Sequence, residues 1–211
     1  MFVRSASGVP PVRSATGRSS LRAAVTAATL LALMTTAACD TKYRDDDAGH
    51  ESESASFSLY DLGSTWRDQL SVSRTLSSLR GRPQVMALVY TNCTSTCPLT
   101  VSAMQQVEAQ AGKDAGFVLV SLDPGRDSPA RLAEFAKEHQ LSVRWTLLSG
   151  DERSVRELAA AIGVKYRTVS PTEIVHTSTL TILDADGRMV AQYSETDAVD
   201  RAVRALQTIA R

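Results

Sequence analysis

The 211-residue chain contains few residues of the types that bind soft metals: three cysteines, three histidines and five methionines. Two of the methionines, Met1 and Met34, lie in the N-terminal segment, so a methionine-rich copper site has little support. The formal net charge is zero. Four arginines before position 39 have no acidic counterpart there, which leaves 19 basic and 23 acidic residues in the rest of the chain. That balance argues against a nucleic-acid partner.

Long hydrophobic runs are also missing. The apolar run at 23–34 is shorter than the roughly 20 residues that a membrane-spanning helix needs. It follows an arginine-bearing segment and precedes the small residues 35–38 and then Cys39, which is the layout of an export signal. The segment resembles a bacterial lipoprotein signal in which Cys39 is lipidated, although Thr36 stands where such signals usually have Leu. Ordinary cleavage and a retained anchor are the alternatives. All three place the folded part outside the cytoplasm, and lipidation would tether it to the outer face of the cytoplasmic membrane.

Residues 40–56 are polar and acidic, and they have too little apolar surface to fold. Such a segment is expected to be a flexible tether, which would let an attached domain reach a membrane-bound partner. We therefore divide the chain into an export signal (1–39), an acidic tether (40–56) and a folded domain (57–211).

The folded domain has the pattern of an α/β protein. Short apolar runs rich in branched residues, typical of buried central strands, occur at 85–90, 117–122 and 180–183. Helical spacing and terminal signals lie between and after these runs. Helices are predicted from Pro98 to about Ala111, from Asp127 or Ser128 to about His139, from Asp151 to Ile162, and from Asp197 to Ala210.

Two further elements complete the predicted topology. The segment 184–187, Asp-Ala-Asp-Gly, is typical of a hairpin turn between 180–183 and 189–193. Residues 57–70 are interpreted as a strand pair that leads into the sheet. The predicted order of elements is strand, helix, strand, helix, strand, helix, hairpin and helix. This order predicts an α/β fold with a central mixed β-sheet flanked by helices.

Only two cysteines, Cys93 and Cys97, fall in the predicted domain, so within it they can pair only with each other. They follow a central strand, and Pro98 suits the first turn of the next helix, so both thiols are expected beside a helix N-terminus. The positive end of the helix dipole stabilises thiolates, the form needed for metal binding and for disulfide exchange. A structural disulfide is the alternative, but closing so small a loop removes little chain entropy.

The three histidines differ in position. His50 lies in the tether and His139 near the end of a predicted surface helix, and both are interpreted as solvated. His176 immediately precedes the predicted strand 177–183, at the end of the loop that contains Pro171. Alone it would be an ordinary loop histidine. Two thiolates suit Cu(I), and an imidazole would complete a trigonal site, whereas a structural zinc site needs four protein ligands.

Three motifs, taken together and in this order, resemble the Sco/SenC family: YTNCTSTCPLT (90–100), SLDPGRDSP (121–129) and HTSTLTILDADGR (176–188). The resemblance implies a thioredoxin-like fold that binds one copper ion, as Cu(I) or Cu(II), through Cys93, Cys97 and His176. It further implies a role in assembling the binuclear copper site of cytochrome c oxidase. The partner would be the copper-accepting subunit of that oxidase or another copper or thiol protein.

The chain departs from the family pattern in two places. Thr94 replaces the proline that usually follows the first cysteine, and Val175 replaces the aspartate that usually precedes the histidine. Neither change removes a ligand, but the missing acid could alter the orientation of the imidazole or a partner contact. Asp123, at the end of a central strand, is a candidate either to orient a metal ligand by a hydrogen bond or to cap the following turn.

Three functions compete at this stage. The main hypothesis is a copper-delivery protein rather than an enzyme. A thiol-disulfide reductase would use Cys93 and Cys97 as a catalytic redox pair that cycles between dithiol and disulfide, and would not need His176. A peroxidase of the same fold is disfavoured because neither cysteine completes the signature Pro-x-x-x-Thr-x-x-Cys.

Overall fold

The computed structural model describes residues 57–194 and 198–209. The predicted export signal (1–39) with Cys39 and the predicted tether (40–56) lie outside the described residues. Among the helices of the described part, none combines the length and the apolar character needed to cross a membrane.

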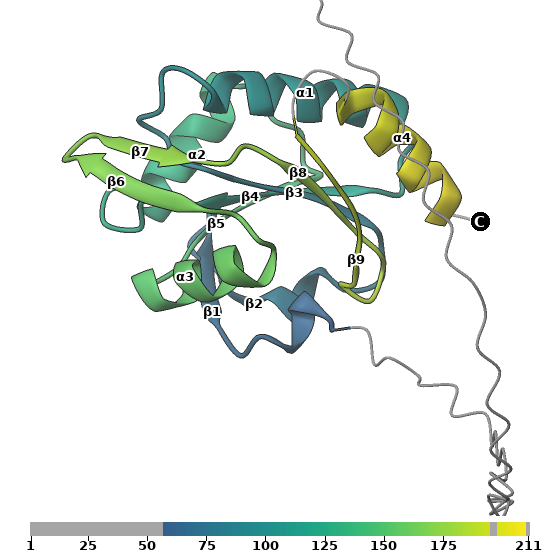
Figure 1. The fold of residues 1–211 in the computed structure, drawn as a ribbon, viewed down its shortest axis with the longest axis horizontal. Coiled ribbons are helices and arrows are strands. Elements are labelled where there is room, and N and C mark those ends of the chain that lie inside the picture. Colours follow the sequence, from purple (N-terminus) through teal and green to yellow (C-terminus); the bar gives the residue numbers. More distant parts are fainter. Residues whose placement is uncertain (1–56, 195–197, 210–211) are drawn as a thin grey trace, which may run out of the picture. The chain divides into compact units, whose positions relative to one another are not determined.

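A seven-stranded mixed sheet in the order β2-β1-β5-β4-β3-β8-β9 forms the centre of the domain (Figure 1). Strands β3, β4 and β5 are parallel to one another, and the outer strands pair antiparallel. The strands are β1 (Thr65–Asp68), β2 (Ser73–Thr75), β3 (Gln84–Val89), β4 (Gly116–Ser121), β5 (Trp145–Ser149), β6 (Tyr166–Ser170), β7 (Glu173–His176), β8 (Leu180–Leu183) and β9 (Met189–Tyr193).

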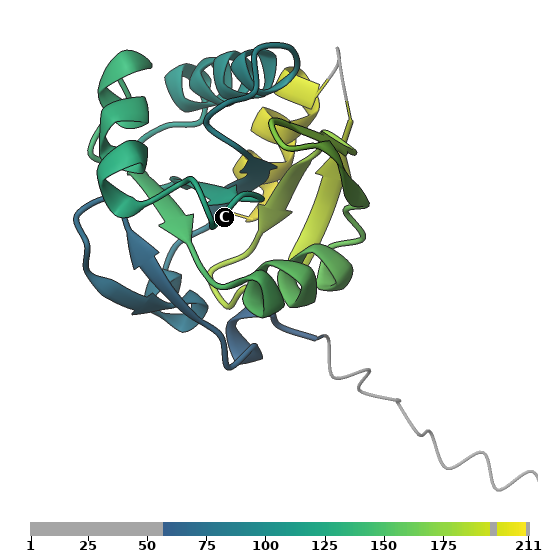
Figure 2. The same ribbon diagram turned by 90° about the vertical axis from the view of Figure 1, so that its left-hand side faces the viewer.

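Helices cover both faces of this sheet. Right-handed crossovers from β3 to β4 and from β4 to β5 place α1 and α2 on the same face, and α4 packs beside α1 there. Helix α3 lies on the opposite face (Figures 1 and 2). All residues of β3 and β4 are buried, as expected of strands covered on both sides. The helices are α1 (Cys97–Gln110), α2 (Pro129–Glu138), α3 (Glu152–Ala161) and α4 (Ala198–Ile209), with short 3-10 helices at Leu59–Asp61 and Leu76–Leu79.

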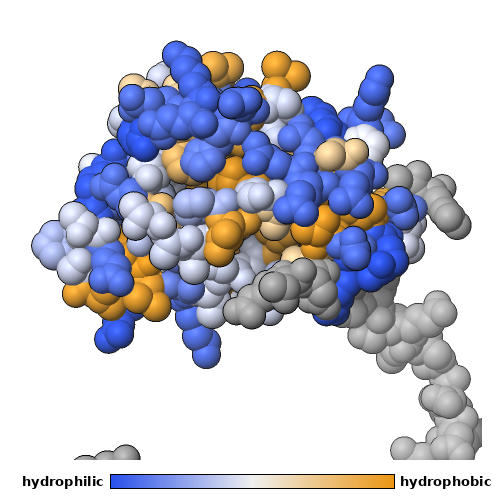
Figure 3. All heavy atoms as spheres, turned by 90° about the horizontal axis from the view of Figure 1, so that it is seen from above, coloured by the Kyte–Doolittle hydropathy of each residue, from blue (hydrophilic) through white to orange (hydrophobic). Residues whose placement is uncertain are grey.

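The outer surface of the α1 and α4 layer is largely hydrophilic, with separate hydrophobic patches between the polar side chains (Figure 3). The inner side of α1 is apolar, because Val101, Met104 and Val107 are fully buried against the sheet. These contacts hold α1, which begins at Cys97, on the core.

Local signals account for most element boundaries. Ser128 caps α2 by accepting a hydrogen bond from the N–H of Arg131, and Asp151 caps α3 in the same way from Ser154. The predicted turn at 184–187 forms as expected, since the Asp184 carboxylate accepts from the N–H groups of Asp186 and Arg188. The predicted fold class, a thioredoxin-like α/β fold with a central mixed sheet, is confirmed.

The interpretation of 57–70 as a strand pair was wrong. Only β1 falls in that range, and it pairs with β2 beyond it. The turn between them is set by the Asp68 carboxylate, which accepts from the N–H groups of Leu70 and Val72, and by Ser71 with φ of 64°. The turn contains neither glycine nor proline and is held by a side chain, so hydrophobic periodicity does not reveal the chain reversal.

The predicted loop before His176 was also wrong, because it is a β-hairpin. Strands β6 and β7 pair antiparallel and form a separate two-stranded sheet, with Pro171 in the turn between them. The following strand begins at Leu180 rather than at 177. Most hairpin side chains are exposed or half-buried, so the segment lacks the apolar alternation that marks a strand in sequence.

Candidate metal centre

The cysteine loop connects the end of β3 to the start of α1. The N–H of Cys93 donates to the carbonyl of Tyr90 over 3.1 Å, and the N–H of Cys97 donates to the Cys93 sulfur over 3.4 Å. The helix begins at Cys97 rather than at Pro98, one residue earlier than the sequence predicts. The Cys93 sulfur thus accepts a free N–H at the N-terminus of α1, where the helix dipole favours negative charge.

The two thiols differ in acidity. Burial alone would raise the pKa of Cys93, but hydrogen bonds from Cys97 and Ser95 outweigh it and lower the pKa to about 6. Burial raises the pKa of Cys97 far above its ordinary value, and the neighbouring Cys93 sulfur and the Asp127 charge raise it further. At neutral pH the pair therefore holds one thiolate on Cys93 and one thiol on Cys97.

The imidazole of His176 lies against the buried thiol. Its Nε2 is 3.7 Å from the Cys97 Sγ, although 79 residues separate the two in sequence. Its Nδ1 is 3.1 Å from the carbonyl oxygen of Thr177. Because a carbonyl can only accept, this contact needs the proton on Nδ1 and leaves the Nε2 lone pair toward the sulfur. Burial lowers the pKa of His176, which favours the neutral, ligand-competent ring.

Tyr90 joins the cysteine loop to the hairpin. The ring stands edge-on to His176 at a centroid distance of 6.3 Å, and its hydroxyl accepts from the N–H of Ile174 over 3.4 Å. Burial raises the pKa of Tyr90, and the nearby Cys93 sulfur raises it further. The phenol therefore packs between the thiols and strand β7.

The structure brings Cys93, Cys97 and His176 into one neighbourhood, with Cys97 in contact with both of the others. Within the described ranges, however, no three His, Cys, Asp or Glu side chains form a ready-made metal cluster. Neither Cys93 nor Cys97 is in a disulfide in the structure, which shows the reduced pair, and the predicted disulfide between them stays a prediction.

The donor set fits a soft metal. Two sulfurs, one of them already a thiolate, and one neutral imidazole with its Nε2 free are the ligands that Cu(I) prefers. The carbonyl of Thr177 orients the ring in the way that hydrogen-bond partners of metal-bound histidines usually do. His139 takes no part in the site, because it caps the C-terminus of α2 and its ring packs on Phe135 at 4.2 Å.

A buried carboxylate, which the sequence argument did not place near the site, lies behind the cysteine loop. Asp127 is 1% exposed. It accepts from the N–H of Thr91 over 3.1 Å, from the Thr91 hydroxyl over 2.5 Å and from the Ser121 hydroxyl over 2.5 Å. The only hint in the sequence was that all three residues fall inside the motifs at 90–100 and 121–129.

Asp123 caps a turn and does not contact the cysteines. Its carbonyl accepts from the N–H groups of Arg126 and Asp127, and its carboxylate pairs with the Arg126 guanidinium at 2.6 Å. Of the two roles that the sequence left open for this residue, the structure supports the cap. Val175, in place of the usual family aspartate, is 53% exposed.

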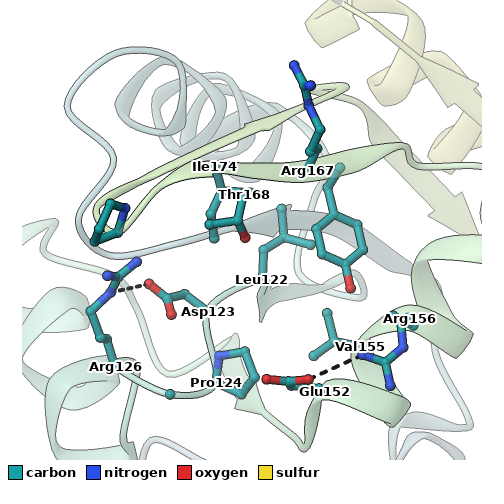
Figure 4. A pocket seen from close by; sticks show the side chains of 13 residues that line it. Leu122, Asp123, Pro124, Arg126, Glu152, Val155, Arg156, Arg167, Thr168 and Ile174 are labelled. Atoms are coloured by element: carbon teal, nitrogen blue, oxygen red, sulfur yellow. Dashed lines mark hydrogen bonds and ion pairs between the residues drawn. The ribbon is translucent and has the colours of Figure 1, made fainter.

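An open cleft of about 700 Å³ lies beside the site but includes none of its three residues. The loop after β4, helix α3 and the β6–β7 hairpin form its walls (Figure 4). Leu122, Val155 and Ile174 provide apolar surface. The ion pairs Asp123–Arg126 and Glu152–Arg156 both line it, on the side away from the hairpin, so the lining carries nearly balanced charge.

A CxxxC loop after a central strand, on a sheet of this topology, defines a thioredoxin-like protein with a thiol and imidazole site. The model of the SCO1/SenC family matches residues 49–211. The chain therefore belongs to the SCO1/SenC family.

Individual relatives agree with this assignment. A SCO1 protein homolog of Bacillus subtilis is 26% identical over 137 residues, which cover 62% of this chain and 71% of the relative. The crystal structure of a SCO1/SenC family lipoprotein from Bacillus anthracis has a TM-score of 0.66 at 21% identity, covering 72% of this chain and 96% of that one. The copper-bound structure of ScoI from Bradyrhizobium japonicum has a TM-score of 0.61 at 24% identity, covering 69% and 96%.

Proposed function

We propose that this protein binds one copper ion through Cys93, Cys97 and His176 and delivers it to a partner outside the cytoplasm. The observation that carries the proposal is the 3.7 Å contact between the Cys97 Sγ and the His176 Nε2. Nothing local requires a histidine from a separate hairpin to end on a buried thiol, whereas a three-donor copper site does.

The chain's own residues would divide the work. Cys93, which has a lowered pKa and is the more exposed of the two residues, is ready as a thiolate and would make the first bond to incoming copper. Cys97 must release its proton to solvent as copper binds, because the lone pair on the His176 Nε2, 3.7 Å from the Cys97 Sγ, has to stay free for the metal. Bound copper would supply the positive charge that makes the buried thiolate stable. Delivery would proceed by stepwise exchange of these ligands for those of the partner.

The proposed destination is the binuclear copper site of cytochrome c oxidase, through its copper-accepting subunit or another copper or thiol protein. Membership of the SCO1/SenC family supports this, as does copper in the ScoI relative. The predicted lipoprotein signal with Cys39 would place the domain at the outer face of the cytoplasmic membrane. The Bacillus anthracis relative, described as a lipoprotein, supports that location.

Thiol-disulfide reduction is the second candidate, and one observation favours it. A thiolate with a pKa of about 6 beside a buried thiol is also the arrangement of a dithiol reductant. Disulfide reduction would leave His176 without a role, and for that reason copper delivery is the better supported function.

One set of proteins separates the two functions. The full chain, purified reduced, would be titrated with Cu(I) against a colorimetric chelator and assayed for reduction of a disulfide substrate. We expect His176→Ala to lose tight copper binding and keep disulfide reduction, and the matched His139→Ala to keep both. Copper bound by His176→Ala as tightly as by the parent would refute the three-ligand site.

A further inference from the structure

The carboxylate of Asp127 has an unusual set of contacts for a residue that precedes a helix. All three of its hydrogen bonds go to Thr91 and Ser121, which lie at the ends of the adjacent central strands β3 and β4. The residue that caps α2 is Ser128, whose hydroxyl accepts from Arg131. The Asp127 side chain is therefore not needed to start the helix, and a role as an ordinary cap does not explain its burial.

The carboxylate is also buried without a direct cation. None of the ion pairs found in the described part of the chain includes Asp127. The Arg131 guanidinium donates to the Thr91 hydroxyl over 3.2 Å rather than to the carboxylate. A buried carboxylate is costly unless neutral donors hold it, so the three donors and the carboxylate depend on one another.

Thr91 gives this group its link to the site. It lies two residues before Cys93, and both of its donors, the N–H and the hydroxyl, end on Asp127. The next hydrogen bond along the loop joins the N–H of Cys93 to Tyr90. The position of the cysteine loop on the sheet is thus set at residues 90 and 91, immediately before the sulfurs.

We propose that Asp127 is a positioning residue: through Thr91 and Ser121 it holds the cysteine loop in the conformation in which Cys93 and Cys97 bind copper. The inference rests on the proposed function for its copper readout. Its second readout, the mobility of the loop in metal-free protein, does not depend on copper.

The chain offers a matched control for this test. Asp68 is 2% exposed and also accepts three hydrogen bonds, from Leu70, Val72 and Arg74. It lies on β1, separated from β3 by two strands. Asp68→Asn therefore perturbs a carboxylate of equal burial away from the cysteines, and it reports the general cost of such a change.

The experiment compares the parent, Asp127→Asn, Thr91→Val, Thr91→Ser and Asp68→Asn as reduced, metal-free full chains. Amide hydrogen exchange in residues 91–97 and in α3 would be followed by mass spectrometry. We expect Asp127→Asn and Thr91→Val to speed exchange in 91–97 by about 10-fold or more while α3 stays at the parent rate. Thr91→Ser, which keeps both donors, should behave as the parent, and Asp68→Asn should leave 91–97 unchanged.

Cu(I) affinity, measured by competition with a chelator, gives the second readout. Loss of a group that orients metal ligands typically weakens binding by about 10- to 100-fold, and we expect this for Asp127→Asn but not for Asp68→Asn. Parent-like exchange in 91–97 together with parent-like affinity in Asp127→Asn would overturn the proposal. If Asp127→Asn does not fold, Thr91→Val against Thr91→Ser decides in the same way. If the parent binds no copper, the proposed function is refuted. The hydrogen-exchange rates in 91–97 still test whether Asp127 positions the cysteine loop.

Discussion

The two halves of the candidate site are held in different ways. Cys93 lies in the loop between the buried strand β3 and helix α1, and Cys97, the first residue of α1, is completely buried. The imidazole comes from the β6–β7 hairpin, which forms a separate two-stranded sheet. Among the residues of these two strands, only Ile174 is buried. Near the site the hairpin is joined to the core by the Tyr90 to Ile174 hydrogen bond and by the contacts of His176 with Cys97 and Tyr90, while two bonds between Lys165 and Thr177 close the base of the hairpin itself.

This difference teaches how a protein can hold a metal and still release it. The sulfurs occupy positions that cannot move without disturbing the core, since interiors are close-packed. The histidine is carried by an element with few buried contacts, which can open locally at small cost. A site built in this way would keep its thiolates in place while the third donor leaves and returns.

The largest expected effect is the loss of either thiol. Cys93→Ala and Cys97→Ala should each abolish stoichiometric copper binding, because one sulfur and one imidazole no longer make a trigonal soft-metal site. Metal analysis of the purified proteins measures this. Cys39→Ala should keep copper, since Cys39 lies outside the predicted folded domain. Retention of bound copper by Cys97→Ala would show that the rigid half is not the essential one.

The next effect concerns the mobility of the two halves. Amides of β6 and β7 in the metal-free parent should exchange about 100-fold faster than those of β3 and β4, because few buried contacts protect the hairpin. Hydrogen exchange with mass spectrometry resolves the two regions. Equal protection of hairpin and central strands would remove the contrast between a fixed and a movable half.

A smaller effect is the acidity of Cys93. Its pKa is lowered to about 6, and the thiolate is the reactive form. The rate of alkylation at Cys93 should therefore rise as pH increases through about 6, whereas Cys97 should react only at much higher pH. Peptide mapping after iodoacetamide treatment at a series of pH values separates the two. A Cys93 midpoint at the ordinary value for a thiol would contradict the hydrogen-bonded thiolate.

The smallest effect is expected at the junction between the halves. Tyr90→Phe removes the acceptor for the N–H of Ile174 and keeps the ring against His176. A long hydrogen bond of this kind contributes about 0.5–1 kcal/mol, so copper affinity should fall by about 2- to 5-fold. Urea unfolding would show little change and chelator competition the small loss. An unchanged affinity would mean that the hairpin is positioned by its packing alone.

Much of the fold was predictable because its signals are local. Strands β3, β4 and β8 were found to within one residue, since strands buried on both faces are continuous apolar runs, as at 85–90. Strand β5 (Trp145–Ser149) was given no range from the sequence. Helix α3 followed from Asp151 and from its buried face of Val155, Leu158 and Ile162. The hairpin before His176 was missed because its side chains are mostly exposed and carry no period.

By itself, the sequence determined which side chains could form the site. It shows directly two cysteines with CxxxC spacing, a proline after them and one suitably placed histidine. Only the tertiary structure decided that the His176 Nε2 lies 3.7 Å from the Cys97 sulfur and that Asp127 is buried behind the loop. The physical reason is that both contacts join residues far apart along the chain. Such contacts depend on how whole elements pack, and no local pattern records that.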